Sequence, residues 1–191
     1  MAEVTPLGIE GAWLYKSSVI SDSRGYFTEW FKSEILTSTT SKSLDVSQAN
    51  LSKSRKGVVR GIHFSIADAG QAKWITCVSG RIWDVVVDIR PHSPTFKKWV
   101  STELDAKSGK SIFIGEGLGH AFLAMEEESI ISYLLSSPYS PNDELAINPK
   151  DPQIGINWPL EELFFSPRDE SAPYLSDLIK TLKESPHTGS N

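Results

Sequence analysis

The sequence has a single cysteine, Cys77, which cannot form an intramolecular disulfide, and it has no Cys-x-x-Cys motif of the kind that builds structural zinc sites. It also lacks any run approaching the roughly 20 apolar residues that a membrane-spanning helix requires. The N-terminus shows no basic start followed by an apolar stretch, as a secretory signal would. These absences predict a cytoplasmic protein with no membrane partner.

An excess of basic residues is missing as well. Lys and Arg number 19 and Asp and Glu number 24, which gives a net charge of −5. Nonspecific binding of nucleic acid relies on a basic face that neutralises phosphates, so nucleic acid is not an expected partner. A local arginine or lysine pocket could still bind a small anion. The length predicts one domain over residues 1–185, followed by a flexible tail over 186–191.

Short β-branched and aromatic segments alternate with glycine and proline, which is typical of an all-β protein. Strands are predicted at residues 57–64, 73–78, 81–89, 98–104, 111–114, 120–125 and 130–135. Ser79 and Gly80 predict a tight hairpin between the second and third of these strands. Strands this short favour a sandwich or a barrel. Apolar spacing near the C-terminus predicts a short helix packed on the barrel, and the Ser/Thr-rich stretch 37–43 is expected to be a surface loop.

Among the four histidines, His92 and His187 are expected at the surface, whereas His63 lies inside a predicted strand. Regular alternation would place Arg60 on one strand face and His63 on the other, unless a bulge at Gly61 changes the assignment. A histidine in a strand is more often a hydrogen-bonded structural residue than a base. This segment alone leaves both interpretations open.

A metal site is not expected. Barrels of this size often bind a metal through His-x-His, but Ser65 stands where the second histidine would be. His63 and His120 remain, without an obvious third ligand, and even an open catalytic site needs about three protein ligands.

Two acidic residues, Asp84 and Asp88, lie four residues apart in one predicted strand and should face the same side. A buried carboxylate needs a partner, and Lys73 and Arg60 are available. The pattern fits either a structural ion pair or the lining of a charged cavity.

Several motifs occur in a fixed order between about residues 19 and 173. They are DSRGYFTE (22–29), QANLS (48–52), GVVRGIH (57–63), AK (72–73), GRIWDVVVDIR (80–90), SPTF (93–96), GHAF (119–122), YSP (139–141), INWP (156–159) and SPRD (166–169). Together they resemble the dTDP-4-dehydrorhamnose 3,5-epimerase family, which acts on dTDP-4-keto-6-deoxyhexoses. The resemblance implies a cupin-type jelly-roll barrel or sandwich, a homodimer with N-terminal strand exchange, and no metal or redox cofactor.

The resemblance also implies a reaction and the residues that perform it. The hydrogens at C3 and C5 of a 4-ketosugar are both α to the carbonyl, so removing either one gives an enolate, and reprotonation on the opposite face inverts that carbon. By this resemblance His63 is the base, Asp169 orients it, Lys73 stabilises the enolate oxygen and Tyr133 is the acid.

Binding residues follow from the same resemblance. They are Arg24, Phe27, Glu29, Gln48, Asn50, Arg60, His120, Tyr139, Glu144 and Arg168. The three arginines would hold the diphosphate, because a guanidinium pairs well with phosphate oxygens. Tyr139 would stack on thymine.

One departure from the family pattern concerns specificity. The run Tyr133-Leu134-Leu135-Ser136 stands where 3,5-epimerases usually have Tyr-Lys-x-Thr, and it resembles monoepimerases of antibiotic deoxysugar pathways. The expectation is therefore inversion at C3 or C5 alone. Two alternatives are a sugar-nucleotide 3,4-ketoisomerase, which could use the same enolate, and a non-catalytic sugar-nucleotide-binding cupin. The presence of base, lysine and acid together argues against the second.

Overall fold

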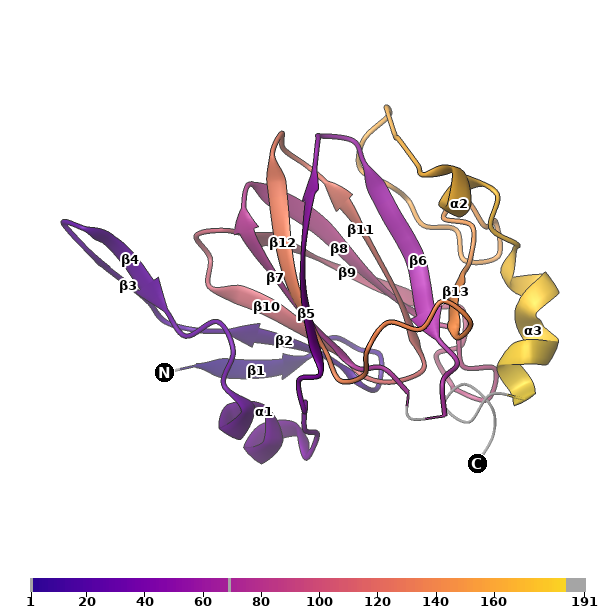
Figure 1. Cartoon of the computed structure of the whole chain (residues 1–191), viewed down its shortest axis with the longest axis horizontal. Coiled ribbons are helices and arrows are strands. Elements are labelled where there is room, and N and C mark those ends of the chain that lie inside the picture. Colours follow the sequence, from indigo (N-terminus) through magenta and orange to yellow (C-terminus); the bar gives the residue numbers. More distant parts are fainter. Residues whose placement is uncertain (1, 69, 185–191) are drawn as a thin grey trace.

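The computed structural model describes residues 2–68 and 70–184, in which the strands form two large antiparallel sheets and one small one (Figure 1). The six-stranded sheet has the order β1 (Glu3–Pro6), β2 (Ala12–Lys16), β10 (Lys110–Ile114), β7 (Lys73–Ser79), β12 (Ser129–Leu135), β5 (Gln48–Ser54). The five-stranded sheet has the order β13 (Glu144–Ala146), β6 (Val59–Ser65), β11 (Leu118–Ala124), β8 (Arg81–Asp88), β9 (Trp99–Asp105). The predicted all-β class is confirmed.

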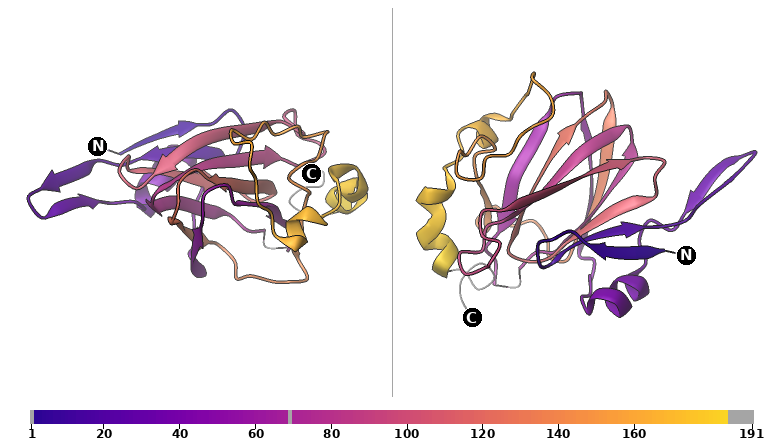
Figure 2. Two further views of the ribbon diagram at one scale, coloured as in Figure 1. Left: turned by 90° about the horizontal axis from the view of Figure 1, so that it is seen from above. Right: turned by 180° about the vertical axis from the view of Figure 1, so that it is seen from behind.

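The two large sheets face each other as a sandwich, and within the described residues they are not closed into a barrel (Figures 1 and 2). A buried apolar cluster fills part of the space between them, with Ile75, Ile112 and Ile131 from one sheet and Ile82 and Phe122 from the other. Burial of such side chains contributes roughly 1.5–3 kcal/mol each, so this cluster holds the sheets together. Polar side chains can then line the remaining space.

Helical segments cover the outer faces of the sandwich. Helix α1 (Ser33–Thr40) packs on the six-stranded sheet, where Leu36 and Trp74 are both fully buried in one cluster. The surface loop expected at 37–43 is therefore wrong for its first residues. Tertiary packing of Leu36 outweighs the weak helix propensity of the Ser/Thr run. The helix ends at Thr40 and is C-capped by Ser41, whose φ of 57° is left-handed.

The C-terminal segment covers the other sheet. The predicted C-terminal helix is confirmed as α3 (Leu175–Glu184), whose Leu175 and Leu182 pack with Ile62 and Val85. The short helix α2 (Pro167–Glu170) precedes it, with Ser166 as its N-cap. No helix of the described part is long and apolar enough to cross a membrane. His92 is exposed, as expected, while the predicted tail 186–191, including His187, lies outside the described residues.

All seven predicted strands are present, with ends that differ by at most two residues. The predicted hairpin is wrong, because β7 and β8 belong to different sheets: β7 pairs with β10 and β12, and β8 pairs with β9 and β11. The turn at Ser79 and Gly80 instead carries the chain from one sheet to the other. Gly80 has φ +69°, and a Cβ there would lie 2.6 Å from the Ser129 Oγ.

A two-stranded hairpin, which we call the arm, consists of β3 (Val19–Asp22) and β4 (Gly25–Thr28). It projects from the sandwich at the end of the molecule opposite α3 (Figures 1 and 2). Ile20, Tyr26 and Phe27 on the arm are 64%, 52% and 62% exposed. An isolated hairpin of this kind is marginally stable in water, so the arm depends on contacts beyond its own two strands.

Candidate active site

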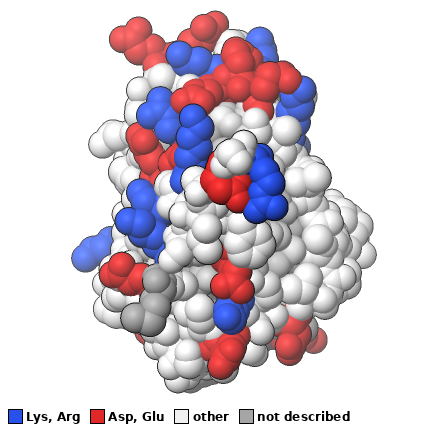
Figure 3. All heavy atoms as spheres, turned by 90° about the vertical axis from the view of Figure 1, so that its left-hand side faces the viewer, with Lys and Arg blue, Asp and Glu red and all other residues white. Residues whose placement is uncertain are grey.

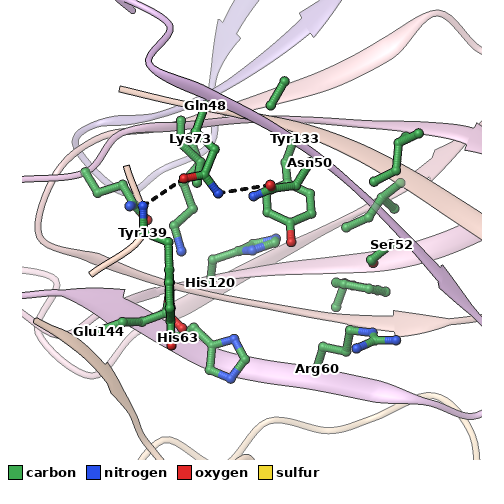
Figure 4. A pocket seen from close by; sticks show the side chains of 16 residues that line it. Gln48, Asn50, Ser52, Arg60, His63, Lys73, His120, Tyr133, Tyr139 and Glu144 are labelled. Atoms are coloured by element: carbon green, nitrogen blue, oxygen red, sulfur yellow. Dashed lines mark hydrogen bonds between the residues drawn. The ribbon is translucent and has the colours of Figure 1, made fainter. Parts of the chain in front are cut away.

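A cavity of about 520 Å³ lies between the two large sheets, on the side where β5 and β6 are. Nine of the predicted site residues line it: Gln48, Asn50, Arg60, His63, Lys73, His120, Tyr133, Tyr139 and Glu144 (Figure 4). The six-stranded sheet supplies Gln48, Asn50, Lys73 and Tyr133, and the five-stranded sheet supplies Arg60, His63, His120 and Glu144. The cavity walls are thus built from strands far apart in sequence.

His63 reaches the cavity because β6 is irregular. The pairing of β6 with β11 shifts register between His120 and Phe122, opposite Gly61. Arg60 and His63 consequently both line the cavity, so the regular alternation that placed them on opposite faces is wrong and the bulge at Gly61 decides the assignment. Gly61 has φ +112°, and a Cβ there would lie 2.4 Å from the His120 carbonyl oxygen. Only glycine fits this position.

The His63 ring is held by Asp169 of α2, whose Oδ1 lies 2.7 Å from the ring Nε2. The Asp169 side chain is 3% exposed. Burial alone would raise the pKa of Asp169, but hydrogen bonds from His63, Ser166 and Gly61 lower it below its ordinary value. Because an ionised carboxylate only accepts hydrogen bonds, the Nε2 atom must carry a proton. The Nδ1 atom is then the ring nitrogen free to act as a base.

Lys73 and Tyr133 lie on neighbouring strands of the opposite sheet. Burial lowers the pKa of Lys73, while the negative charges of Glu144 and Asp84 act in the other direction. Burial raises the pKa of Tyr133, which keeps its phenol protonated, against the smaller lowering effects of Arg60 and an Asn50 hydrogen bond. Lys73 and Tyr133 both line the cavity wall facing His63, where burial favours the neutral phenol of Tyr133 and the nearby negative charges of Glu144 and Asp84 favour the ammonium of Lys73.

His120 forms a second imidazole–carboxylate pair, with its Nε2 2.8 Å from the Asp84 Oδ2. The sequence predicts Lys73 or Arg60 as the partner of Asp84, but its hydrogen-bond partner is His120. Lys73 influences it only through charge. Asp88, the second acid on β8, bonds to Arg90, Ser93 and Thr95 instead. It is a buried structural residue, because the cavity does not include it.

A chain of hydrogen bonds orders the wall near Tyr139. The backbone N–H of Tyr139 donates to the Gln48 Oε1 at 2.9 Å, and the Gln48 Nε2 donates to the Asn50 Oδ1 at 2.9 Å (Figure 4). Tyr139 is 49% exposed, so its ring is available to a planar ligand. On the facing wall, the Arg168 Nη1 donates to the Glu144 Oε1 at 3.2 Å. Arg168 therefore lies next to the cavity rather than in its lining.

Three predicted binding residues lie elsewhere. Arg24 is on the arm, 88% exposed in its side chain, and pairs with Asp22. Phe27 and Glu29 line a separate hollow at the base of the arm, together with Tyr15. None of the three lines the cavity formed by the described residues of this chain.

Several lining residues are not among the site residues predicted from the sequence: Ala49, Leu51, Ser52, Gln71, Phe122, Ile131 and Leu135, of which Leu135 enters only as part of the Tyr133–Ser136 run. For Asp84 the sequence leaves open a structural ion pair or a place in the lining; in the structure Asp84 is bonded to the lining residue His120 without lining the cavity itself. Gln48 and Asn50 alternate along β5, so strand periodicity could have pointed to Ser52. Phe122 and Ile131 read only as core residues, and they belong to the core cluster as well as to the cavity wall. Within residues 2–68 and 70–184, no group of three His, Cys, Asp or Glu side chains could hold a metal ion.

Comparison with known proteins agrees with this geometry. Residues 6–177 match the family model described as dTDP-4-dehydrorhamnose 3,5-epimerase. A curated enzyme of that name from Mycolicibacterium smegmatis is 48% identical over 172 residues, covering 90% of this chain and 85% of the relative.

Two solved structures are similar to the chain over nearly all of its length. NovW, a 4-keto-6-deoxy sugar epimerase from the novobiocin cluster of Streptomyces spheroides, has a TM-score of 0.92 at 41% identity, with 95% of this chain and 91% of NovW covered. ChmJ, a 3'-monoepimerase from Streptomyces bikiniensis in complex with dTDP-quinovose, has a TM-score of 0.88 at 41% identity, with 92% and 89% covered. The resemblance inferred from the sequence is confirmed: the chain belongs to the dTDP-4-dehydrorhamnose 3,5-epimerase family and is an epimerase.

Proposed function

We propose that this enzyme epimerises a dTDP-4-keto-6-deoxyhexose, at C3 or C5, in deoxysugar biosynthesis. The single observation that carries the proposal is the arrangement of His63, Lys73 and Tyr133 around one cavity, with the imidazole on one wall and the ammonium and phenol on the other. This arrangement supplies a base, an oxyanion partner and an acid for chemistry next to a ketone.

In the proposed first step, the Nδ1 of His63 removes the α-hydrogen as a proton. The C–H bonding pair becomes the C=C bond of an enolate, and the carbonyl π electrons move to O4. Asp169 stabilises the resulting imidazolium at 2.7 Å. Lys73 places its ammonium beside the developing O4 anion, in a buried position where such a charge acts strongly.

In the second step, Tyr133 gives its hydroxyl proton to the carbon from the opposite face. The C=C pair of the enolate forms the new C–H bond, the electrons on O4 re-form the carbonyl, and the configuration at that carbon is inverted. Proton exchange with solvent then returns the Tyr133 phenolate and the His63 imidazolium to their starting forms. Burial holds the pKa of Tyr133 above its ordinary value, so the phenol carries its proton at neutral pH. A neutral imidazole is a suitable base there, because the unperturbed pKa of histidine is about 6.5.

The nucleotide would bind at the mouth of the cavity. We assign thymine to the ring of Tyr139, with Gln48 and Asn50 beside it, because these groups are joined by the hydrogen bonds described above. Arg60, with Arg168 and Glu144 nearby, would hold the diphosphate and orient the sugar.

The remaining binding residues, Arg24, Phe27 and Glu29, would act on the cavity of a second copy. We propose a homodimer in which arms are exchanged, because the exposed apolar side chains of the arm require a covering surface. Figure 3 views the molecule from the arm end, where a broad area without charged groups lies beside mixed acidic and basic residues. We further propose that residues 1–185 form one domain and that the enzyme is cytoplasmic.

The test is proton NMR in deuterated water with dTDP-4-keto-6-deoxyglucose and no added metal. The expected result is deuterium entering one α position together with inversion of that carbon. Absence of exchange at both C3 and C5 would contradict the proposal. Exchange and inversion at both positions would keep the epimerase and exclude the single-centre specificity. A 3-keto product would instead identify a ketoisomerase.

A further inference from the structure

The buried pair Asp84–His120 is not used in the mechanism above. Asp84 on β8 is 0% exposed, and its Oδ2 accepts from the His120 Nε2 at 2.8 Å. Among the residues that the structure describes, its other oxygen, Oδ1, has no hydrogen-bond partner. Leaving a buried acceptor unpaired costs about 1–3 kcal/mol. A carboxylate kept at such a cost, and bonded to a cavity residue, points to a role in the site.

The bond fixes the protonation of the His120 ring. A carboxylate oxygen can only accept, so the Nε2 atom bears the hydrogen. In the neutral ring, Nε2–H is therefore bonded to Asp84 and the lone pair is on Nδ1. This lone pair can accept a hydrogen bond and cannot donate one.

The partner of that lone pair must be a donor. His120 lines the cavity, and its side chain is 10% exposed. A ketone oxygen and a diphosphate offer only acceptors, whereas the hydroxyl groups at C2 and C3 of the hexose are donors. Resting on the proposed function, we propose that Asp84 is a positioning residue that locks His120 as the Nε2–H tautomer, so that Nδ1 accepts a hydrogen bond from a hexose hydroxyl.

Binding of unreactive ligands tests this directly. Titration calorimetry is done with dTDP-6-deoxyglucose, its 2-deoxy and 3-deoxy analogues, and dTDP alone. The Asp84→Asn variant is expected to bind dTDP-6-deoxyglucose about 10-fold more weakly, as loss of one well-placed hydrogen bond would give. It should bind dTDP as the wild type does. For the analogue that lacks the partner hydroxyl, the difference between variant and wild type should disappear.

Asp88→Asn is the matched control, because Asp88 lies on the same strand, is equally buried, and is bonded to Arg90 away from the cavity. It should leave the ligand affinities of the folded protein unchanged. If Asp84→Asn does not fold, His120→Gln and the wild type are compared with the same ligands, and the same loss of hydroxyl dependence is expected.

The tautomer gives a readout that a purely structural role of Asp84 would not predict. Long-range ¹H–¹⁵N NMR of the wild type should show His120 as the Nε2–H form. An Nδ1–H form in the wild type would overturn the inference, as would an equal loss of affinity for all three sugar ligands. Failure of the proposed function is distinguishable, since wild-type enzyme would then bind dTDP-6-deoxyglucose no more tightly than dTDP.

Discussion

His63 and His120 are direct partners across the β6–β11 pairing, and each ring is bonded through Nε2 to a different buried aspartate. Asp169 comes from α2 and Asp84 from β8, so the two carboxylates approach from different elements. The two rings therefore share the same tautomer and expose the same nitrogen, Nδ1. The difference in exposure, 27% for His63 and 10% for His120, is consistent with a base at the more open position.

The carboxylate behind His63 should control its activity. In Asp169→Asn, the amide can donate to Nε2, which favours a proton on Nδ1 and removes the lone pair that acts as the base. We expect the rate of deuterium exchange to fall about 10²–10⁴-fold, the range typical of general base catalysis. Exchange is followed by NMR in deuterated water.

Ser166→Ala provides the control for that variant. Ser166 caps α2 by accepting from the Asp169 backbone N–H, so its loss should cost about 1 kcal/mol of stability while exchange is retained. If Asp169→Asn exchanges deuterium at the wild-type rate, the proposed role of Asp169 is refuted.

Tyr133 should affect inversion more than exchange. Tyr133→Phe removes the proton donor but leaves His63 and Lys73 in place, so the enolate still forms and can be reprotonated by the imidazolium on the original face. We expect deuterium to enter the α position near the wild-type rate, while the inverted product forms at least about 10²-fold more slowly. NMR separates the two events, and an equal loss of both would assign Tyr133 to enolate formation instead.

The parts of this site predictable from sequence are those that lie within single strands. For the strands that carry His63, Lys73, His120 and Tyr133, the ends predicted from sequence lie within two residues of the observed ends. This works because β-branched runs between glycines are a local signal. The pairing of β7 and β8 was not predictable in this way, since a short turn between strands does not reveal whether they remain in one sheet.

The hydrogen-bond partner of Asp84 could not be predicted from the sequence either. Sequence shows that a buried acid needs a partner, but the choice among Lys73, Arg60 and His120 depends on the register between β8 and β11.

Which side chains of the Tyr133-Leu134-Leu135-Ser136 run reach the cavity likewise depends on the packing of the sheet. Leu134 packs in the cluster under α1, away from the cavity, whereas Leu135 lines it. Of the two leucines in this run, only Leu135 can therefore contact a ligand in the cavity directly.

Deprotonation of Lys73 should set the alkaline limit of activity. The ammonium is needed to stabilise the enolate, so activity is present below its pKa and is lost as pH rises through it. Burial lowers that pKa from 10.5, whereas burial raises the pKa of Tyr133 above 10.0. In a plot of exchange rate against pH, the fall at alkaline pH (the alkaline limb) should consequently have its midpoint below pH 10.5. Lys73→Arg should be slower but should lack the alkaline limb, since arginine stays protonated. An alkaline limb at the wild-type pH in this variant would show that another group causes it.

Activity should depend on a residue from each of two copies. His63→Asn supplies an intact arm without a base, and Arg24→Ala supplies a base with an impaired arm. When the two inactive variants are unfolded together and refolded, random pairing should restore about one quarter of wild-type activity, since half of the dimers have one complete site. Activity is measured against each variant refolded alone. A mixture no more active than the sum of its parts would place Arg24 in its own cavity or outside the site.

Gly61 should be the least replaceable glycine of the site. An added Cβ would meet the His120 carbonyl oxygen at 2.4 Å and the Ala121 Cβ at 2.7 Å, at a φ of +112°. We expect Gly61→Ala to lower the free energy of unfolding by about 3 kcal/mol, from left-handed strain together with overpacking. Gly8→Ala has similar strain at φ +85° but no atom within 4 Å, so it should cost only about 1 kcal/mol. Urea unfolding compares the two, and equal losses would show that the β6–β11 contact can relax around a methyl group.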